Sequence, residues 1–236
     1  MNRLPVASSQ LPETLGRLDY FRDWPVDTLE RLAVGAHVLS VSKNAWVCHR
    51  GDGLPNLYVV MGGLIRLYIP LPNNMERVVY LVDEGSSFGE ACLILQEPCP
   101  YSAVAGKDSH LMSIDARVFR RELERNMDLA RQVLERVSRH WMDTLRDTEI
   151  CAQRSSVQRV ACYLMTHQPA PDQASFQVSL SARKQDVAAK LGLSQETFSR
   201  VLGFLDKQGL IQVKGNRIRV QDGPRLTQVT SMRDCR

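Results

Sequence analysis

The sequence predicts an α+β protein in which an antiparallel β-roll, one long helix and a winged helix-turn-helix follow one another. The first observation is a series of short β-rich runs between turn clusters over residues 37–114. The second is a helical stretch without Gly or Pro over residues 126–152, and the third is a helix–turn–helix–hairpin order after it. The expected parts are a tail at 1–20, the β-roll at 21–126, the long helix at 127–153, the winged helix-turn-helix at 154–228 and a second tail at 229–236.

The composition is that of a globular protein: of 236 residues, 44% are hydrophobic and 24% are charged. No apolar run approaches the roughly 18 residues of a membrane helix, and the N-terminus lacks the apolar centre of a secretory signal. The six cysteines include no C-x-x-C pair, which argues against a zinc ribbon or a thioredoxin motif. We therefore expect a cytoplasmic protein with reduced cysteines, no membrane partner and no metal site.

Charge is distributed unevenly along the chain. Residues 151–236 carry 13 basic and 6 acidic side chains, a net +7, whereas residues 1–150 carry 17 and 20, a net −3. A basic C-terminal third on a mildly acidic body is typical of a nucleic-acid-binding module joined to another domain.

The roll is predicted from short apolar runs that end in turn residues. A short helix is expected to begin in the Trp24-Pro25-Val26-Asp27 stretch and to end at Ala33, with Leu29 and Leu32 on one face. The strands are expected at 57–60, 64–69 and 78–82, with turns at 50–53, 62–63, 72–74 and 83–85.

The long helix carries apolar residues on one side over about 25 residues, which is more than one small domain usually buries. We expect this side to pair with a second copy of the chain, giving a homodimer. The alternative is that the helix packs on its own roll. The expected interface residues are Leu134, Val137, Trp141, Leu145 and Thr148.

The C-terminal third has the element order of a winged helix-turn-helix. Gly192 supplies the turn, and Ser194 can cap the helix that follows. The expected elements are a helix at 157–166, a strand at 176–180, helices at 183–191 and 195–207, and strands at 210–213 and 217–220.

The helix at 195–207 has two distinct faces. One is an apolar stripe, and the other presents Glu196, Ser199 and Arg200 at the helix start, where a recognition helix contacts base edges. Arg200 can bond guanine O6 and N7, and Glu196 can accept from cytosine N4. The alternative is an exposed Glu196–Arg200 ion pair of small energy. The expected DNA-binding residues are Arg183, Lys184, Gln195, Glu196, Thr197, Ser199 and Arg200.

Four motifs resemble the CRP/FNR superfamily of bacterial transcription regulators over nearly the whole chain. Three are roll segments, Arg50-Gly51-Asp52, residues 57–63 and Phe88-Gly89-Glu90, and the fourth is Glu-x-x-Ser-Arg at 196–200. The resemblance implies a cyclic-nucleotide-binding-like roll, a dimerisation helix, and a homodimer on palindromic double-stranded DNA with TTGAT- or TTGAC-like half-sites. RNA polymerase is then an expected partner.

The resemblance also implies an effector pocket, but with departures from the cyclic-AMP branch. Tyr101 stands where cyclic-AMP-binding members have an Arg, and Thr144-Leu145 replaces two hydroxyl residues. A buried phosphate without its cation is costly, which argues against cyclic AMP. The first cysteine is Cys48, so the N-terminal cluster of the iron–sulfur members is absent. The implied pocket residues are Gly89, Glu90, Tyr101, Ser102, Thr144 and Leu145.

The sequence resembles the Dnr/NnrR-like, nitric-oxide-responsive branch more closely, which implies haem as a candidate cofactor. Adjacent Cys48 and His49 are the first ligand candidates to test, and a redox switch of Cys92 and Cys99 is a second hypothesis. The motifs that resemble this branch are Phe88-x-Glu90-Ala91, Pro100-Tyr101-x-Ala103, Arg159-Val160-x-x-Tyr163-Leu164 and residues 196–200. The other candidate haem ligands are His37, His110, His140 and His167.

No catalytic motif accompanies these features. The sequence has no P-loop, no metal-spaced His pair and no G-x-S-x-G, so we expect no enzymatic step. The alternative function is a cyclic-nucleotide-binding regulatory module whose main partner is a protein, which would need no recognition helix.

Overall fold

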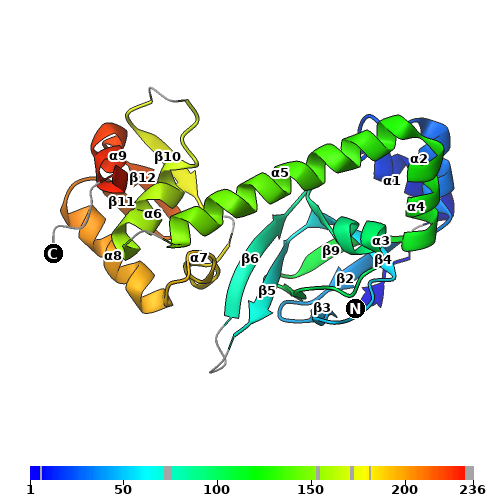
Figure 1. Cartoon of the computed structure of the whole chain (residues 1–236), viewed down its shortest axis with the longest axis horizontal. Coiled ribbons are helices and arrows are strands. Elements are labelled where there is room, and N and C mark those ends of the chain that lie inside the picture. Colours follow the sequence, from blue (N-terminus) through cyan, green and yellow to red (C-terminus); the bar gives the residue numbers. More distant parts are fainter. Residues whose placement is uncertain (6, 72–75, 153–154, 171–172, 181, 232–236) are drawn as a thin grey trace. The chain divides into compact units, whose positions relative to one another are not determined.

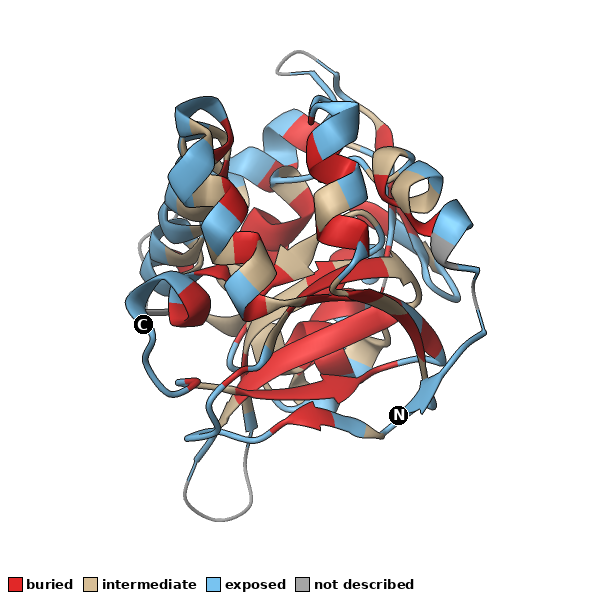
Figure 2. Cartoon of the chain, turned by 90° about the vertical axis from the view of Figure 1, so that its right-hand side faces the viewer, coloured by how far each residue is buried: buried red, intermediate tan, exposed pale blue. Residues whose placement is uncertain are grey.

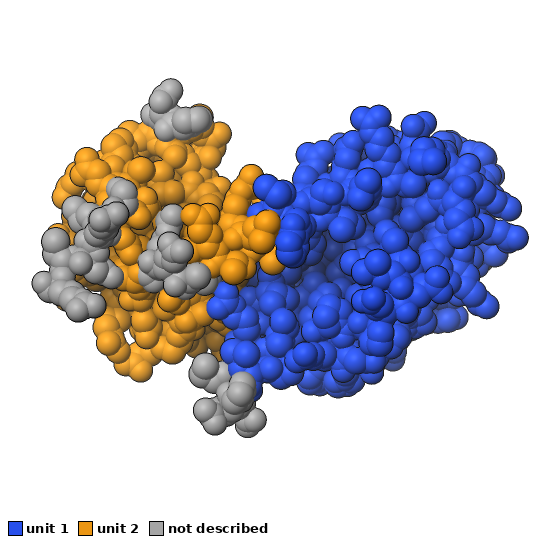
Figure 3. Space-filling view, in the orientation of Figure 1, with its two compact units in different colours: residues 1–142 blue, residues 143–236 orange. Residues whose placement is uncertain are grey.

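The computed structural model describes residues 1–5, 7–71, 76–152, 155–170, 173–180 and 182–231. The chain divides into an N-terminal unit, residues 1–142, and a C-terminal unit, residues 143–236 (Figure 3). Helix α5 (Met127–Ala152) runs through the boundary between the two units. Within the described residues, no helix combines the length and apolar character needed to cross a membrane.

The N-terminal unit is built on two antiparallel sheets (Figure 1), as the sequence predicts. In the second sheet, Ile65 faces Val82 across a hairpin, and both side chains are fully buried. Figure 2 shows buried positions in red along the strands of this unit. The first sheet has the order β1 (Asn2–Arg3), β2 (Ala36–Val41), β9 (Ser109–Asp115), β4 (Asn56–Gly62), β7 (Ser87–Phe88); the second has the order β3 (Trp46–Cys48), β8 (Ser102–Ala105), β5 (Leu64–Pro70), β6 (Glu76–Asp83).

The three strands expected from the sequence are confirmed as parts of β4, β5 and β6. Gly63 makes the turn between β4 and β5 with a φ of +100°. A Cβ at this position would lie 2.7 Å from the Asp108 carbonyl oxygen, so the turn requires glycine. The predicted turn at 72–74 lies outside the described residues. On either side of it, β5 pairs with β6 along its whole length, from Leu64 opposite Asp83 to Pro70 opposite Glu76.

Short helices cover the roll, and one of them corrects the expectation of an N-terminal tail at 1–20. Leu11, Leu15 and Tyr20 are buried in the core, because this segment folds back on the roll. A six-residue helix with Pro12 in its first turn is too short to show a hydrophobic period, so the sequence pattern missed it. The elements are η1 (Ser8–Gln10), α1 (Leu11–Gly16), α2 (Val26–Ala33), α3 (Glu90–Leu95) and α4 (Ala116–Arg125).

The C-terminal unit is a winged helix-turn-helix, also as predicted. Its small antiparallel sheet has the strand order β10–β12–β11, and Gly192 turns the chain between α7 and α8 with a φ of +64°. The last helix was not predicted; it runs across the expected boundary at 228/229, and Leu226 is its fully buried anchor. The elements are α6 (Ser156–Met165), β10 (Phe176–Ser179), α7 (Lys184–Lys190), α8 (Gln195–Lys207), β11 (Ile211–Lys214), β12 (Arg217–Val220) and α9 (Gly223–Ser231).

Candidate functional site

Helix α8 is capped at its N-terminus and buried along one side, and these two features determine which of its side chains are exposed to solvent. Ser194 caps the helix, its Oγ accepting from the Thr197 amide at 3.1 Å. The predicted apolar stripe is buried, so Glu196, Ser199 and Arg200 are turned outward and exposed. The stripe consists of Phe198, Val201, Leu202 and Leu205.

The exposed face of α8 contains the ion pair that the alternative interpretation expected. The Arg200 Nη2 lies 2.8 Å from the Glu196 Oε1, and the two side chains are 72% and 82% exposed. Such an exposed i,i+4 pair contributes only about 0.3–0.5 kcal/mol. Breaking it to bond a base therefore costs little, and base contact is compatible with the pair.

The start of α7 assigns different roles to its two cations. The Arg183 Nε donates to the Asp186 Oδ2 at 3.2 Å, and Asp186 is completely buried. Arg183 therefore neutralises a buried carboxylate. Lys184, the next residue, is the first residue of α7 and forms no ion pair within the described part of the chain.

Arg159 holds the turn of the helix-turn-helix, a role that the sequence did not reveal. Its Nη1 donates from α6 to the carbonyl oxygens of Leu191, at 3.3 Å, and Gly192, at 3.4 Å. These carbonyls follow the end of α7, where a helix leaves acceptors unpaired. Because donor and acceptors are more than 30 residues apart, no local motif signals this contact.

The outer face of the β10–β12–β11 sheet is basic. It forms a shallow cavity of about 460 Å³. Arg217 stands directly opposite Lys214 in the sheet, a like-charge pair that is unfavourable without a bound anion. The described lining residues include no carboxylate; they are Gln177, Gln212, Lys214, Asn216, Arg217 and Arg219.

Two predicted effector residues lie at the start of α3. Gly89 has a φ of +108°, so its backbone favours glycine. Glu90 is 8% exposed and accepts a hydrogen bond from the Ser87 hydroxyl. Burial raises the pKa of Glu90, while the bond from Ser87 opposes that shift.

Two residues that the sequence analysis did not single out surround Glu90. Arg136 of α5 places its guanidinium carbon 4.4 Å from the centre of the Tyr20 ring and donates to the Tyr20 carbonyl oxygen at 3.1 Å. Burial raises the pKa of Tyr20, and the negative charge of Glu90 adds to the shift. Arg136 therefore supplies positive charge near a buried carboxylate.

Tyr101 and Ser102 lie at the beginning of β8. The Ser102 Oγ accepts from the Arg50 amide at 3.0 Å. Burial raises the pKa of Tyr101, and the nearby thiols add to the shift, so the phenol stays neutral. The position of the expected phosphate-binding cation therefore carries no charge. The remaining predicted pocket residues, Thr144 and Leu145, belong to α5 in the C-terminal unit.

The predicted interface stripe of α5 is exposed at most of its positions. Leu134 is 65%, Trp141 61% and Leu145 43% exposed, and Thr148 is exposed as well. Val137 differs, because it is half-buried against the core of the N-terminal unit. Exposed apolar side chains in a row are typical of an interface.

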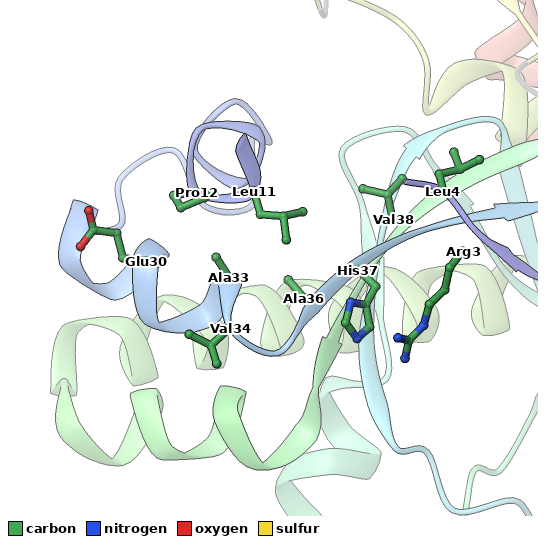
Figure 4. Close-up of a pocket in the computed structure, with 10 residues that line it drawn as sticks. All are labelled: Arg3, Leu4, Leu11, Pro12, Glu30, Ala33, Val34, Ala36, His37 and Val38. Carbon is green, nitrogen blue, oxygen red and sulfur yellow. The ribbon is translucent and has the colours of Figure 1, made fainter. Parts of the chain in front are cut away.

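The histidines occupy different surroundings. His37 lines a cavity of about 410 Å³ between α1, α2 and the first two strands (Figure 4). Cys48 faces Cys99, whereas the His49 ring lies tilted against Trp46 at 4.1 Å between ring centres, so this adjacent pair does not converge on one site. The His140 ring lies tilted against Tyr80, His167 bonds the Tyr163 carbonyl, and His110 is exposed. Among the described residues, no group of three metal-ligating side chains occurs.

Comparison with known proteins links both units to one family. A cyclic nucleotide-binding domain model matches residues 38–126, and a Crp-like helix-turn-helix domain model matches residues 158–229. The cAMP-activated global transcriptional regulator CRP of Pasteurella multocida is 22% identical over 194 residues, 81% of this chain and 93% of that protein. The Global nitrogen regulator of Synechococcus elongatus is 27% identical over 185 residues, 75% of this chain and 82% of that protein.

Solved structures share the fold. FixK2 from Bradyrhizobium japonicum has a TM-score of 0.72 at 20% identity, covering 84% of this chain and 99% of that one. A CooA mutant from Carboxydothermus hydrogenoformans has a TM-score of 0.74 at 15% identity, covering 91% of this chain and 95% of that one. The two family models, the transcription regulators among the relatives and this fold agree. The chain belongs to the CRP/FNR superfamily and is a DNA-binding transcription regulator with an effector-binding domain.

Proposed function

We propose that the chain is a cytoplasmic regulator without an enzymatic step, which binds TTGAT- or TTGAC-like palindromes as a homodimer and responds to a small effector. The observation that carries the proposal is the exposed start of α8, where Glu196, Ser199 and Arg200 occupy the position from which recognition helices contact bases. We also propose a functional division into the roll, which includes the packed segment from Leu11 and ends at residue 126, the dimerisation helix α5 and the winged helix-turn-helix, which extends through α9.

The contacts divide into base readout and backbone positioning. Arg200 and Glu196 read base edges, and Ser199 adds a hydrogen bond. Lys184 neutralises a phosphate, while Arg183 orients α7 through Asp186. Gln195 and Thr197 flank the reading face at the helix start.

A gel shift tests this function. The full chain is titrated on a TTGAT-N4-ATCAA duplex and on a scrambled duplex of the same composition, at several salt concentrations. Specific binding is expected to be at least 10³-fold tighter than binding to the scrambled duplex. Equal affinity for both would contradict the proposal and favour the regulatory module whose main partner is a protein.

RNA polymerase is the protein partner in this proposal. A cleft of about 480 Å³ between α2 and α4 is lined by five arginines and two glutamates, and this excess of positive charge suits an acidic protein surface. Two of its arginines, Arg31 and Arg125, are held by the buried carboxylate of Glu122 at 2.8 and 3.2 Å. Its other arginines are Arg117, Arg120 and Arg121.

The effector is proposed to be other than cyclic AMP. One relative is named for activation by cyclic AMP and another for nitrogen regulation, so the relatives do not share one signal. Tyr101 supplies no charge for a phosphate, and Arg66, a substitute cation, is engaged by Glu76 at 3.3 Å. Calorimetry is expected to detect no cyclic AMP binding at micromolar concentration; micromolar affinity would contradict this.

We place the chain in the Dnr/NnrR-like, nitric-oxide-responsive branch, with haem as the candidate cofactor. The cavity beside His37 fits such a group in chemistry, because its walls are mainly apolar and Arg3 offers a cation for a propionate. Haem iron, when bound, would supply the site that takes nitric oxide. His37 is the residue that would hold it.

Visible absorption after anaerobic haem addition tests this assignment. A Soret band is expected for the native chain and is expected to be lost or shifted in His37→Ala. His110→Ala is the matched control, because His110 lies exposed on the neighbouring strand β9. An unchanged spectrum in His37→Ala would exclude His37 as the ligand.

A further inference from the structure

Three free cysteines of the N-terminal unit lie together beside the effector pocket. Cys48, Cys92 and Cys99 are 7%, 7% and 1% exposed. The Sγ atoms of Cys48 and Cys99 are 4.0 Å apart, although the two residues are 51 positions apart in the chain. Cys48 ends β3, and Cys99 lies shortly before β8, the strand that pairs with β3.

In the contact between Cys48 and Cys99, either thiol can donate its proton to the other. Interaction with Cys99 and burial raise the pKa of Cys92, and interaction with Cys48 raises the pKa of Cys99 to about 11. Interaction with Cys99 lowers the pKa of Cys48. Cys48 is therefore the thiol that loses its proton most readily, and a thiolate is the reactive form of cysteine.

The backbone around Cys99 keeps the pair in place. The Cys99 amide donates to the Asp52 carbonyl at 2.8 Å, and the Gly51 amide donates to the Cys99 carbonyl at 2.8 Å. The segment after Cys48 is thus bonded to the segment that carries Cys99. Disulfide formation requires the sulfur atoms to approach from 4.0 Å to about 2.05 Å, a movement within reach of side-chain rotation.

We propose that Cys48 and Cys99 form a reversible disulfide in response to a peroxide. The Cys48 thiolate attacks one peroxide oxygen, breaks the O–O bond and becomes a sulfenic acid, while the other oxygen leaves as water after taking up a proton. The Cys99 sulfur then attacks the Cys48 sulfur and displaces the second water. Two thiols and one hydrogen peroxide give one disulfide and two waters, and a cellular thiol reduces the bond again.

This pairing differs from the Cys92–Cys99 switch that the sequence suggested. The sulfur–sulfur contact at 4.0 Å selects Cys48 and Cys99, and the raised pKa of Cys92 keeps that third thiol protonated. The Cys48–Cys99 bond would join the end of β3 to the segment just before Tyr101 and Ser102. Because the Ser102 hydroxyl already accepts from the Arg50 amide, oxidation acts directly on the wall of the effector pocket.

Peptide mapping of the full chain tests the proposal. The protein is treated with hydrogen peroxide, its remaining thiols are blocked with N-ethylmaleimide, and a non-reducing digest is analysed by mass spectrometry. The expected product is a peptide pair joined through Cys48 and Cys99, with the loss of two free thiols per chain and their return on adding dithiothreitol. Cys162, buried in the C-terminal unit, is expected to remain reduced.

Serine variants identify the pair and keep the result independent of haem or DNA. Cys48→Ser and Cys99→Ser are expected to lose the linked peptide, whereas Cys92→Ser and Cys162→Ser keep it. Circular dichroism shows whether each variant is folded, and the map of the native chain decides the question if one is not. A Cys92–Cys99 link, or an unchanged count of free thiols after oxidation, would overturn the proposal.

Discussion

In the proposed complex with DNA, Arg200 is the residue whose chemistry most directly determines sequence preference. Its guanidinium is exposed and forms a weak pair with Glu196. A bidentate Arg–guanine contact contributes about 1–3 kcal/mol of discrimination, and a symmetric dimer uses it twice. Arg200→Ala is therefore expected to cost roughly 2–6 kcal/mol of affinity for a TTGAT-type duplex and much less for scrambled DNA.

Lys184→Ala is the matched comparison, because a phosphate contact carries no sequence information. It is expected to weaken binding to all duplexes alike and to lower the salt slope by about one per contact. Fluorescence titrations of both variants on both duplexes measure these effects. A uniform loss in Arg200→Ala would make Arg200 a backbone contact.

Glu90 is expected to make the stability of the folded chain depend on pH, and its burial determines whether stability rises or falls with pH. Burial raises the pKa of Glu90 in the folded chain above the ordinary value of about 4.3. At pH values between the unfolded and the folded pKa, the folded state therefore binds more protons than the unfolded state. The stabilisation that this group contributes is fully present below the unfolded pKa and is lost as pH rises through the folded pKa.

Glu90→Gln removes the titrating group while keeping an acceptor for the Ser87 hydroxyl. We expect its free energy of unfolding to fall less than that of the native chain as pH rises from 4 to 7. Urea unfolding at a series of pH values measures the difference. Parallel pH profiles for the two proteins would show that Glu90 carries no raised pKa.

At the scale of elements, α5 has one side that its own unit buries and one that it leaves exposed. Leu129 and Val133 are buried in the N-terminal core, whereas Leu134 and Trp141 are exposed. The double substitution Leu134→Glu, Trp141→Glu is therefore expected to break a dimer without disturbing the core. Each new charge would be exposed in the monomer and buried only in the dimer interface.

Sedimentation measures the oligomeric state of this double variant. Arg139→Glu is the control: it also changes charge on an exposed position of α5, but about 140° around the helix from Leu134. The native chain and the control are expected to be dimers and the double variant a monomer. A dimeric double variant would show that the exposed stripe is not the interface.

The sequence predicted best the elements with a strong local pattern. β5 and β6 were found because each is a short β-rich run bounded by turn residues, and α8 because a helical stripe runs through it. Helices α1 and α9 were missed because each buries too few side chains for a period to appear. The Glu90–Tyr20–Arg136 neighbourhood was missed for a different reason: its members are far apart in the chain, and only the fold brings them together.

At the scale of the whole molecule, the proposed dimer links dimerisation to DNA binding. A palindrome holds two half-sites, so the second recognition helix of a dimer binds from a high effective concentration once the first has bound. The same coupling works in reverse, and palindromic DNA favours the dimer. The monomeric Leu134→Glu, Trp141→Glu variant is therefore expected to lose about 10²–10⁴-fold in affinity for the palindrome.

A duplex with a single half-site separates this effect from damage to α8. On that duplex the double variant and the native chain are expected to bind with equal affinity, because each uses one recognition helix and one set of basic side chains. Anisotropy titrations on the two duplexes at the same salt concentration give both values. If the variant loses affinity equally on both, its C-terminal unit is impaired, and the loss on the palindrome does not arise from the missing partner.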